Sequence, residues 1–124
     1  MVWCSFAKNQ DDMDTIYLEV CNKFSNNENI EILRCDSHVV GDFIPKKTLD
    51  WVYIDGNHSF DFVLSDLNLS IELIKDVSYI VGDDYFNSVE VRNAVDFFVE
   101  SNKKVITNFY EKIVCIICIL LNPL

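Results

Sequence analysis

Hydrophobic positions recur at helical spacing in three segments of the chain. The first spans residues 13–24 and follows Asp11, Asp12 and Asp14, which are acids that suit a helix N-terminus. The second is an apolar stripe over four turns: Phe60, Val63, Leu64, Leu67, Ile71 and Ile74. The third opens at Asn87, which with Glu90 resembles a capping box, and it carries an apolar face through residues 91–99. The pattern predicts three amphipathic helices.

Short runs rich in β-branched and aromatic residues lie between these helices. They predict strands over residues 30–35, 49–54, 77–81, 105–107 and 113–121. Alternating strands and helices are typical of a mostly parallel sheet covered by helices, so we expect an α/β, Rossmann-like sheet with helices on both faces. No repeat and no Pro/Gly/Ser linker divides the chain, and its 124 residues predict a single domain over 1–124.

Charge and glycine content exclude several classes of function. Twenty Asp and Glu against ten Lys and Arg give a net charge of -10, which argues against a nucleic-acid surface. The three glycines, Gly41, Gly56 and Gly82, lie too far apart for a glycine-rich phosphate loop. The apolar run at residues 113–121 is far shorter than the ~20 residues of a membrane span. We therefore expect no nucleic-acid partner and no membrane insertion.

The chain has five cysteines, an odd number, and no signal-peptide pattern. Both features predict reduced thiols in a cytoplasmic protein. Cys115 and Cys118 have the spacing of a metal or redox pair, but they lie inside the apolar run without a second pair or a nearby histidine. We interpret them as small hydrophobic residues of a buried strand.

Acidic residues follow three of the predicted strands. Asp36 comes after the first, Asp55 after the second, and Asp83 with Asp84 after the third. The carboxyl ends of parallel strands share one edge of a sheet, where ligands bind in open α/β folds. Carboxylates brought together there need a shared proton or a hard cation such as Mg²⁺ or Ca²⁺. The alternative is that these acids serve only as helix caps and turn residues.

Two of these strand ends carry motifs that resemble a known family. Residues 49–60 (LDWVYIDGNHSF), then Asp66 and Leu67, then residues 79–85 (YIVGDDY) are similar to the class I S-adenosylmethionine-dependent methyltransferases. The closest resemblance is to methyltransferase family 24, which is related to metal-dependent catechol and caffeoyl-CoA O-methyltransferases. The resemblance covers roughly residues 11–100, and its motifs are specific in combination.

The resemblance implies a role for each matching residue. Asp55, Asp83 and Asp84 are expected to hold a divalent metal such as Mg²⁺ beside the acceptor hydroxyl. His58 is expected to act as general base, with Asp55 beside it in the catalytic group. The implied S-adenosylmethionine contacts are listed together: Asp36, Ser37, His38 and Asn57.

Parts of the family pattern have no counterpart in this sequence. The first strand and its glycine-rich loop are expected before Met1, and residues 2–6 have no acid to bind the cofactor ribose. The chain therefore resembles the C-terminal two-thirds of a methyltransferase, an N-terminally truncated domain. The missing strand predicts an exposed apolar sheet edge and self-association through it.

These features favour an S-adenosylmethionine-dependent methyltransferase, acting on a hydroxyl of a small acceptor or a sugar. An imidazole ordinarily titrates near neutral pH, which suits His58 to proton removal; a turn residue before Phe60 is the alternative. Two other functions stay open. One is a non-catalytic remnant or interaction module that does not bind the cofactor. The other is a metal-dependent sugar-nucleotide transferase that uses Asp83 and Asp84, which leaves Asp55 and His58 unexplained.

Overall fold

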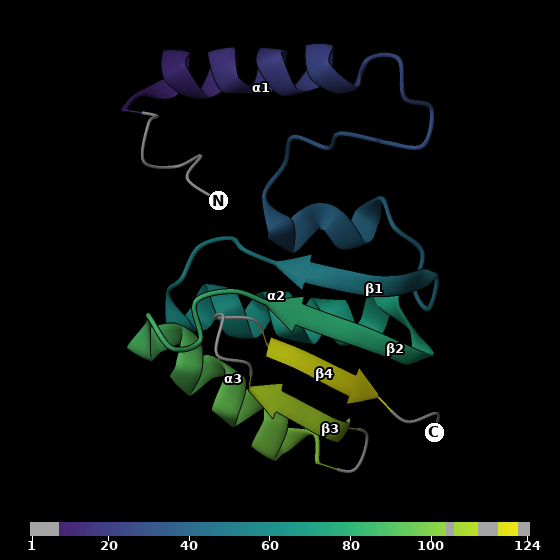
Figure 1. Cartoon of the computed structure of the whole chain (residues 1–124), viewed down its shortest axis with the longest axis vertical. Coiled ribbons are helices and arrows are strands. Elements are labelled where there is room, and N and C mark those ends of the chain that lie inside the picture. Colours follow the sequence, from purple (N-terminus) through teal and green to yellow (C-terminus); the bar gives the residue numbers. More distant parts are fainter. Residues whose placement is uncertain (1–7, 104–105, 112–116, 122–124) are drawn as a thin grey trace. The chain divides into compact units, whose positions relative to one another are not determined.

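The computed structural model describes residues 8–103, 106–111 and 117–121, and these form two compact units, Met1–Cys35 and Asp36–Leu124 (Figure 1). In the first unit, α1 (Gln10–Phe24) begins where the Asn9 side chain accepts a hydrogen bond from the Asp12 backbone N–H. Asp11 and Asp12 occupy its first turn, as the sequence predicts. Later in this unit, Arg34 pairs with Asp14 of α1, and its guanidinium lies over the Tyr17 ring.

The predicted strand over residues 30–35 is wrong. This segment has no regular secondary structure, and Ile30 and Leu33 are both exposed. A strand needs a neighbouring strand to pair its backbone N–H and C=O groups, and none of the described strands lies in a sheet with this segment. Local β propensity alone therefore did not produce a strand here.

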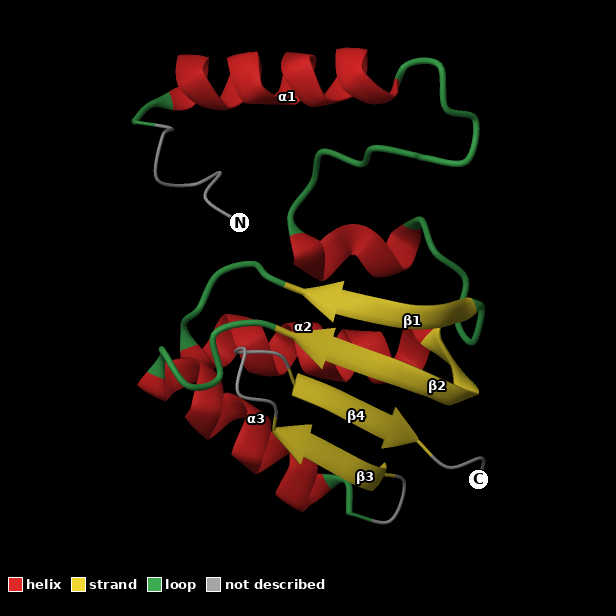
Figure 2. Cartoon of the chain, in the orientation of Figure 1, coloured by secondary structure: helices red, strands yellow, loops and turns green. Residues whose placement is uncertain are grey.

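The second unit contains the sheet and the helices that pack on it. Its elements are, in chain order, the short 3₁₀ helix η1 (Ser37–Asp42), β1 (Leu49–Ile54), α2 (Phe60–Leu73), β2 (Ile74–Gly82), α3 (Val89–Ser101), β3 (Ile106–Glu111) and β4 (Ile117–Leu121). The described strands form one sheet in the order β1-β2-β4-β3 (Figure 2). Residues 112–116, Cys115 among them, lie outside the described residues, and the side chain of Cys118 is not described.

The described sheet is mixed rather than mostly parallel. β1 and β2 are parallel neighbours joined through α2, as expected for a crossover connection. β4 runs antiparallel to both β2 and β3. Because only a short connection separates β3 from β4, β4 has to return antiparallel to β3, and it inserts between β3 and β2.

Within the second unit, α2 and α3 pack on the same face of the sheet (Figure 1). The core between them and the strands includes Leu67, Ile80, Ala94 and Phe98, which are fully or almost fully buried. On the opposite face, a set of large side chains of β1 and β2 is exposed: Trp51, Tyr53, Val77 and Tyr79. The expectation of helices on both faces is therefore not met by the described residues of this unit.

Two helix boundaries differ from the prediction for local reasons. Ile74 does not end α2 but begins β2, which starts at Ile74 rather than at residue 77. α3 is capped by Ser88, whose hydroxyl accepts a hydrogen bond from the Val91 N–H, and not by Asn87. The Asn87 amide instead donates a hydrogen bond to Asp84. No described helix is both long enough and apolar enough to cross a membrane.

Candidate functional site

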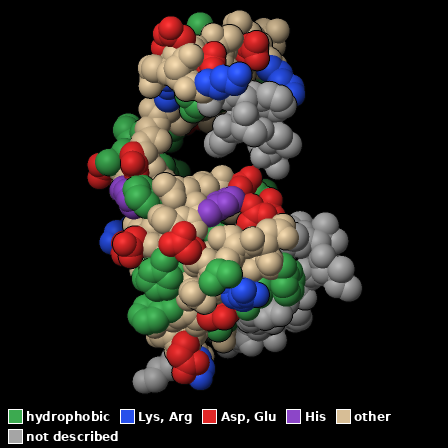
Figure 3. Space-filling model, turned by 90° about the vertical axis from the view of Figure 1, so that its left-hand side faces the viewer, with side chains coloured by type: hydrophobic (Ala, Val, Ile, Leu, Met, Phe, Trp, Pro, Cys, Tyr) green, Lys and Arg blue, Asp and Glu red, His purple; other side chains and the backbone are tan. Residues whose placement is uncertain are grey.

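The carboxyl ends of β1 and β2 lie next to each other and carry the candidate site. Ile54 pairs with Gly82 in the sheet register, and the Asp83 N–H donates a 3.2 Å hydrogen bond to the Ile54 carbonyl. The loops that follow the two strands therefore leave the sheet side by side. Seen from the side toward which β1 and β2 point, acidic side chains gather beside a histidine (Figure 3).

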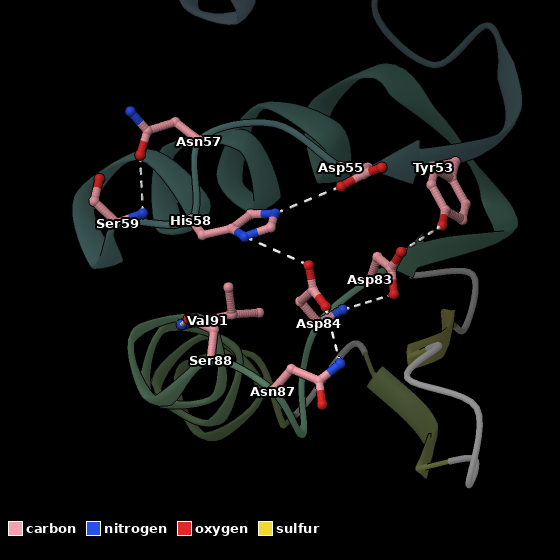
Figure 4. A network of polar contacts seen from close by, with 10 residues as sticks. All are labelled: Tyr53, Asp55, Asn57, His58, Ser59, Asp83, Asp84, Asn87, Ser88 and Val91. Atoms are coloured by element: carbon pink, nitrogen blue, oxygen red, sulfur yellow. Dashed lines mark hydrogen bonds and ion pairs between the residues drawn. The ribbon is translucent and has the colours of Figure 1, made fainter. Parts of the chain in front are cut away.

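The group formed at this edge consists of Asp55, His58 and Asp84. The imidazole of His58 lies between the two carboxylates, with Nε2 3.5 Å from Asp55 Oδ1 and Nδ1 3.5 Å from Asp84 Oδ2 (Figure 4). One ligand atom from each of the three residues lies within 4.8 Å of the others. The tertiary structure thus brings together three of the residues that the sequence analysis selected.

Asp84 is held by several interactions in an uncommon backbone conformation. Its φ angle is 60°, in the left-handed region that Asp and Asn tolerate better than most residues with a side chain. Its carbonyl accepts hydrogen bonds from the N–H groups of Asn87 and Ser88, and its Oδ1 accepts one from the Asn87 amide at 3.1 Å. This turn directs the other carboxylate oxygen of Asp84 toward His58 (Figure 4).

Asp83 is turned away from this group. Its Oδ1 accepts a 2.8 Å hydrogen bond from the Asp84 N–H, and its Oδ2 accepts a long, 3.4 Å hydrogen bond from the Tyr53 hydroxyl (Figure 4). Burial, followed by the nearby negative charges of Asp83 and Asp55, raises the pKa of Tyr53 above its usual value of 10.0. Tyr53 therefore stays a neutral hydrogen-bond donor at physiological pH.

Tyr53 is the residue of this edge that the sequence analysis missed. The one feature of the sequence that could have identified Tyr53 is its position two residues before Asp55, which places it near the same strand end. A lone aromatic residue in a strand, however, is usually read as a packing residue. Only the neighbouring strand shows that its hydroxyl meets Asp83.

The four residues expected to contact a cofactor lie in two local turns. Asp36 caps η1, where its Oδ1 accepts a hydrogen bond from the His38 N–H and lies 2.9 Å from His38 Nδ1. The His38 ring lies 4.8 Å from the Phe62 ring, while Ser37 is the first residue of η1. Asn57 Oδ1 accepts a 2.9 Å hydrogen bond from the Ser59 N–H at the start of α2.

The donor set fits a divalent cation. Two carboxylates and an imidazole, none of them fully buried, are ligands of the kind that bind Mn²⁺, Fe²⁺ or Zn²⁺, while Mg²⁺ prefers oxygen ligands alone. The same arrangement would suit proton uptake by His58, because the two carboxylates beside the ring would stabilise an imidazolium. Cation binding and proton transfer both need a group that solvent can reach, and none of these three residues is fully buried.

The chain is similar to one family of known proteins over the region that carries this site. Residues 5–85 match the family model described as a methyltransferase domain, methyltransferase family 24. The match includes Asp55, His58 and Asp84 and ends at Tyr85, just after the second strand end. No curated protein and no solved structure matches the chain.

Proposed function

Because this chain belongs to methyltransferase family 24, we propose that it transfers a methyl group from S-adenosylmethionine to a hydroxyl of a small acceptor or a sugar. S-Adenosylmethionine would supply an electrophilic methyl group, so the chain's own task is to position the acceptor and remove its proton. The observation that carries the proposal is the grouping of Asp55, His58 and Asp84 at one sheet edge within the matched region.

His58 is the proposed proton acceptor. Its imidazole is 41% exposed in its side chain, so an acceptor hydroxyl can reach it from solvent. Asp55 and Asp84 face its two nitrogens and would stabilise the imidazolium that forms when the proton arrives. The cofactor contacts are proposed for Asp36, Ser37 and His38 at the start of η1 and for Asn57 in the turn before α2.

A divalent cation is a second part of the proposal. Asp55 and Asp84, together with a reoriented Asp83, would hold it, which leaves the His58 imidazole free to accept the proton. Bound there, it would supply positive charge that lowers the pKa of the acceptor hydroxyl. A cation would also offset the repulsion between the carboxylates of this edge.

Calorimetric titration of the chain with S-adenosylmethionine tests the cofactor part of the proposal. We expect micromolar binding that is unchanged in Asp61→Asn, a variant of an exposed acid in the first turn of α2. Absence of binding at millimolar S-adenosylmethionine would overturn the proposal and favour a non-catalytic module. Binding of a nucleotide sugar with Mn²⁺ in place of S-adenosylmethionine would instead favour a sugar-nucleotide transferase.

Titration with Mn²⁺, followed by electron paramagnetic resonance, tests the cation part. Asp84→Asn removes one proposed ligand, so we expect its Mn²⁺ affinity to fall by about tenfold or more, the effect of losing one charged ligand interaction of ~1.4 kcal/mol or more. Asp61→Asn removes one negative charge, as Asp84→Asn does, but it leaves Asp55, His58 and Asp84 intact. It should therefore bind Mn²⁺ as tightly as the unchanged protein does. Equal affinities of the two variants would show that the cation does not bind at this edge.

A further inference from the structure

An open pocket lies beside β1, and Asp55 at the end of this strand is part of its lining. We call it the η1 pocket; it has a volume of about 320 Å³ and is lined by η1 and the residues after it, β1 and α2. Its apolar wall includes six described residues: Val40, Ile44, Leu49, Val52, Leu69 and Leu73. The polar groups in it include Ser37, Asp55, Asp66 and Ser70. The function proposed above uses Ser37 and Asp55 of this wall, but it leaves Asp66 and the apolar wall without a role.

Asp66 is the unusual member of this pocket. It lies on the inner face of α2 with only 9% of its surface exposed, and its Oδ1 has no hydrogen-bond partner among the described residues. The neighbouring Ser70 hydroxyl does not serve the carboxyl group, because it donates to the main-chain carbonyl of Asp66 at 2.7 Å. A buried polar atom without a partner is costly, and the cost is larger for a charged group. The geometry therefore indicates that a donor absent from this structure completes the site.

The turn after β1 runs along one side of the Asp66 carboxyl group. A Cβ atom placed on Gly56 would lie 3.5 Å from Asp66 Oδ2, so the backbone of this turn passes close to the carboxyl group. Gly56 and Asp66 both line the η1 pocket. The carboxyl group thus belongs to the pocket wall at the end where β1 leaves the sheet.

The wall determines the chemistry of an occupant. None of the described residues that line the pocket is Lys, Arg or His, whereas Asp55 and Asp66 are both acidic. An anionic ligand would meet negative charge without any compensating cation. The apolar wall suits a hydrophobic body, and the volume lies at the lower end of the range of small-molecule pockets, roughly 300–1,000 Å³. A molecule with an apolar ring system and one positively charged N–H donor satisfies all of these conditions.

We propose that the η1 pocket binds a small organic amine, whose ammonium group donates a hydrogen bond to Asp66 and whose apolar body contacts Val52 and Leu69. A turn of the Asp66 side chain would bring the buried oxygen that has no partner in the described structure into the pocket, where it would accept this charge-assisted hydrogen bond. This inference concerns binding alone, so it does not depend on methyl transfer. It adds to the acidic edge a ligand site that shares Asp55 with it.

The probe is 1-naphthylmethylamine, with 1-naphthaleneacetate as an anion of similar size. Binding of each to the full chain is followed by protein-observed NMR, in which intermolecular contacts between the naphthalene protons and the methyl groups of Val52 and Leu69 locate the ligand. We expect the amine to give these contacts and the anion to give none. No contact from the amine, or equal binding of the anion, overturns the proposal.

Asp66→Asn tests the proposed hydrogen bond, and Asp61→Asn on the exposed side of α2 is its control. We expect Asp66→Asn to weaken amine binding by about tenfold or more, the range for a hydrogen bond to a charged group, and Asp61→Asn to leave it unchanged. Circular dichroism establishes that both variants are folded; if Asp66→Asn does not fold, the location of the naphthalene contacts in the unchanged protein decides. A folded Asp66→Asn variant with unaltered affinity overturns the proposal.

Discussion

At the scale of single residues, the backbone of Asp84 is the most constrained feature of the candidate site. Its φ of 60° is a conformation that costs an L-residue roughly 1–2 kcal/mol and costs glycine almost nothing. Asp84 stays in this conformation because its carbonyl and side chain hold the turn that leads into α3. The placement of its carboxylate beside His58 depends on this turn.

Comparison of Asp84→Ala with Asp84→Gly isolates this backbone effect. Both variants lose the carboxylate, but only alanine keeps the steric penalty at positive φ. We expect Asp84→Gly to have the higher free energy of unfolding, by about 1 kcal/mol, in urea denaturation. Equal stability of the two variants would show that residue 84 does not adopt the left-handed conformation in solution.

The hydroxyl of Tyr53 is expected to lose its proton only at a raised pH. Because burial and the nearby carboxylates raise its pKa above 10.0, a phenolate at this position is disfavoured in the folded chain. The resulting contribution to stability is fully present below pH 10 and is lost as the pH rises through the raised pKa. The phenolate absorbance of Tyr53 is the difference in absorbance between the unchanged chain and Tyr53→Phe. It should therefore appear at a higher pH than that of a free tyrosine.

Asp83→Asn provides the control for this titration. Removing the Asp83 charge removes one cause of the shift, so we expect the pKa of Tyr53 to move down toward its ordinary value. The residual shift reflects burial and the remaining acids. A Tyr53 pKa that is the same in both backgrounds would contradict the contact between Tyr53 and Asp83.

At the scale of elements, the start of α3 distinguishes two neighbouring cap candidates. The sequence favours Asn87 because of Glu90 three residues later, whereas the structure assigns the cap to Ser88. We expect Ser88→Ala to lower the free energy of unfolding by about 1 kcal/mol, because the Val91 N–H loses its acceptor. Ser101→Ala, at the exposed end of the same helix, should have a smaller effect in the same thermal or urea measurement. The reverse order would contradict the Ser88 cap.

The elements also show where periodicity was sufficient. α1, α2 and α3 were predicted within a few residues because their apolar stripes repeat over several turns. The strand over residues 49–54 was predicted with the bounds of β1. Residues 30–35 were also predicted as a strand but form none, since a strand depends on a partner that is distant in sequence.

At the scale of the whole molecule, we propose that the free edge of β1 mediates self-association. In the described sheet β1 pairs only with β2, so its other edge has no strand partner. Trp51 of this strand is 60% exposed on the open face. We expect the sedimentation coefficient of the chain to rise with its concentration.

Glutamate substitutions at two exposed positions of the same face distinguish association through the edge strand β1 from association through its neighbour β2. Trp51→Glu places a charge on the edge strand, and Val77→Glu places the same charge on the exposed face of β2. Trp51→Glu should reduce self-association more strongly, because charges on edge strands oppose pairing. A monomer at all concentrations, or equal effects of the two variants, would contradict association through the β1 edge.

The sequence by itself determined which segments became α1, α2, α3 and β1, because helical and strand periodicity are local properties. It also placed acids directly after the two parallel strands β1 and β2, and its motifs indicated the family that the comparison confirmed. Only the tertiary structure decided that Asp55 and Asp84 meet at His58 while Asp83 turns to Tyr53, since a side-chain direction depends on the turn that carries it. The same is true of the mixed sheet and of buried Asp66, because strand pairing and burial are set by contacts between residues far apart in the chain.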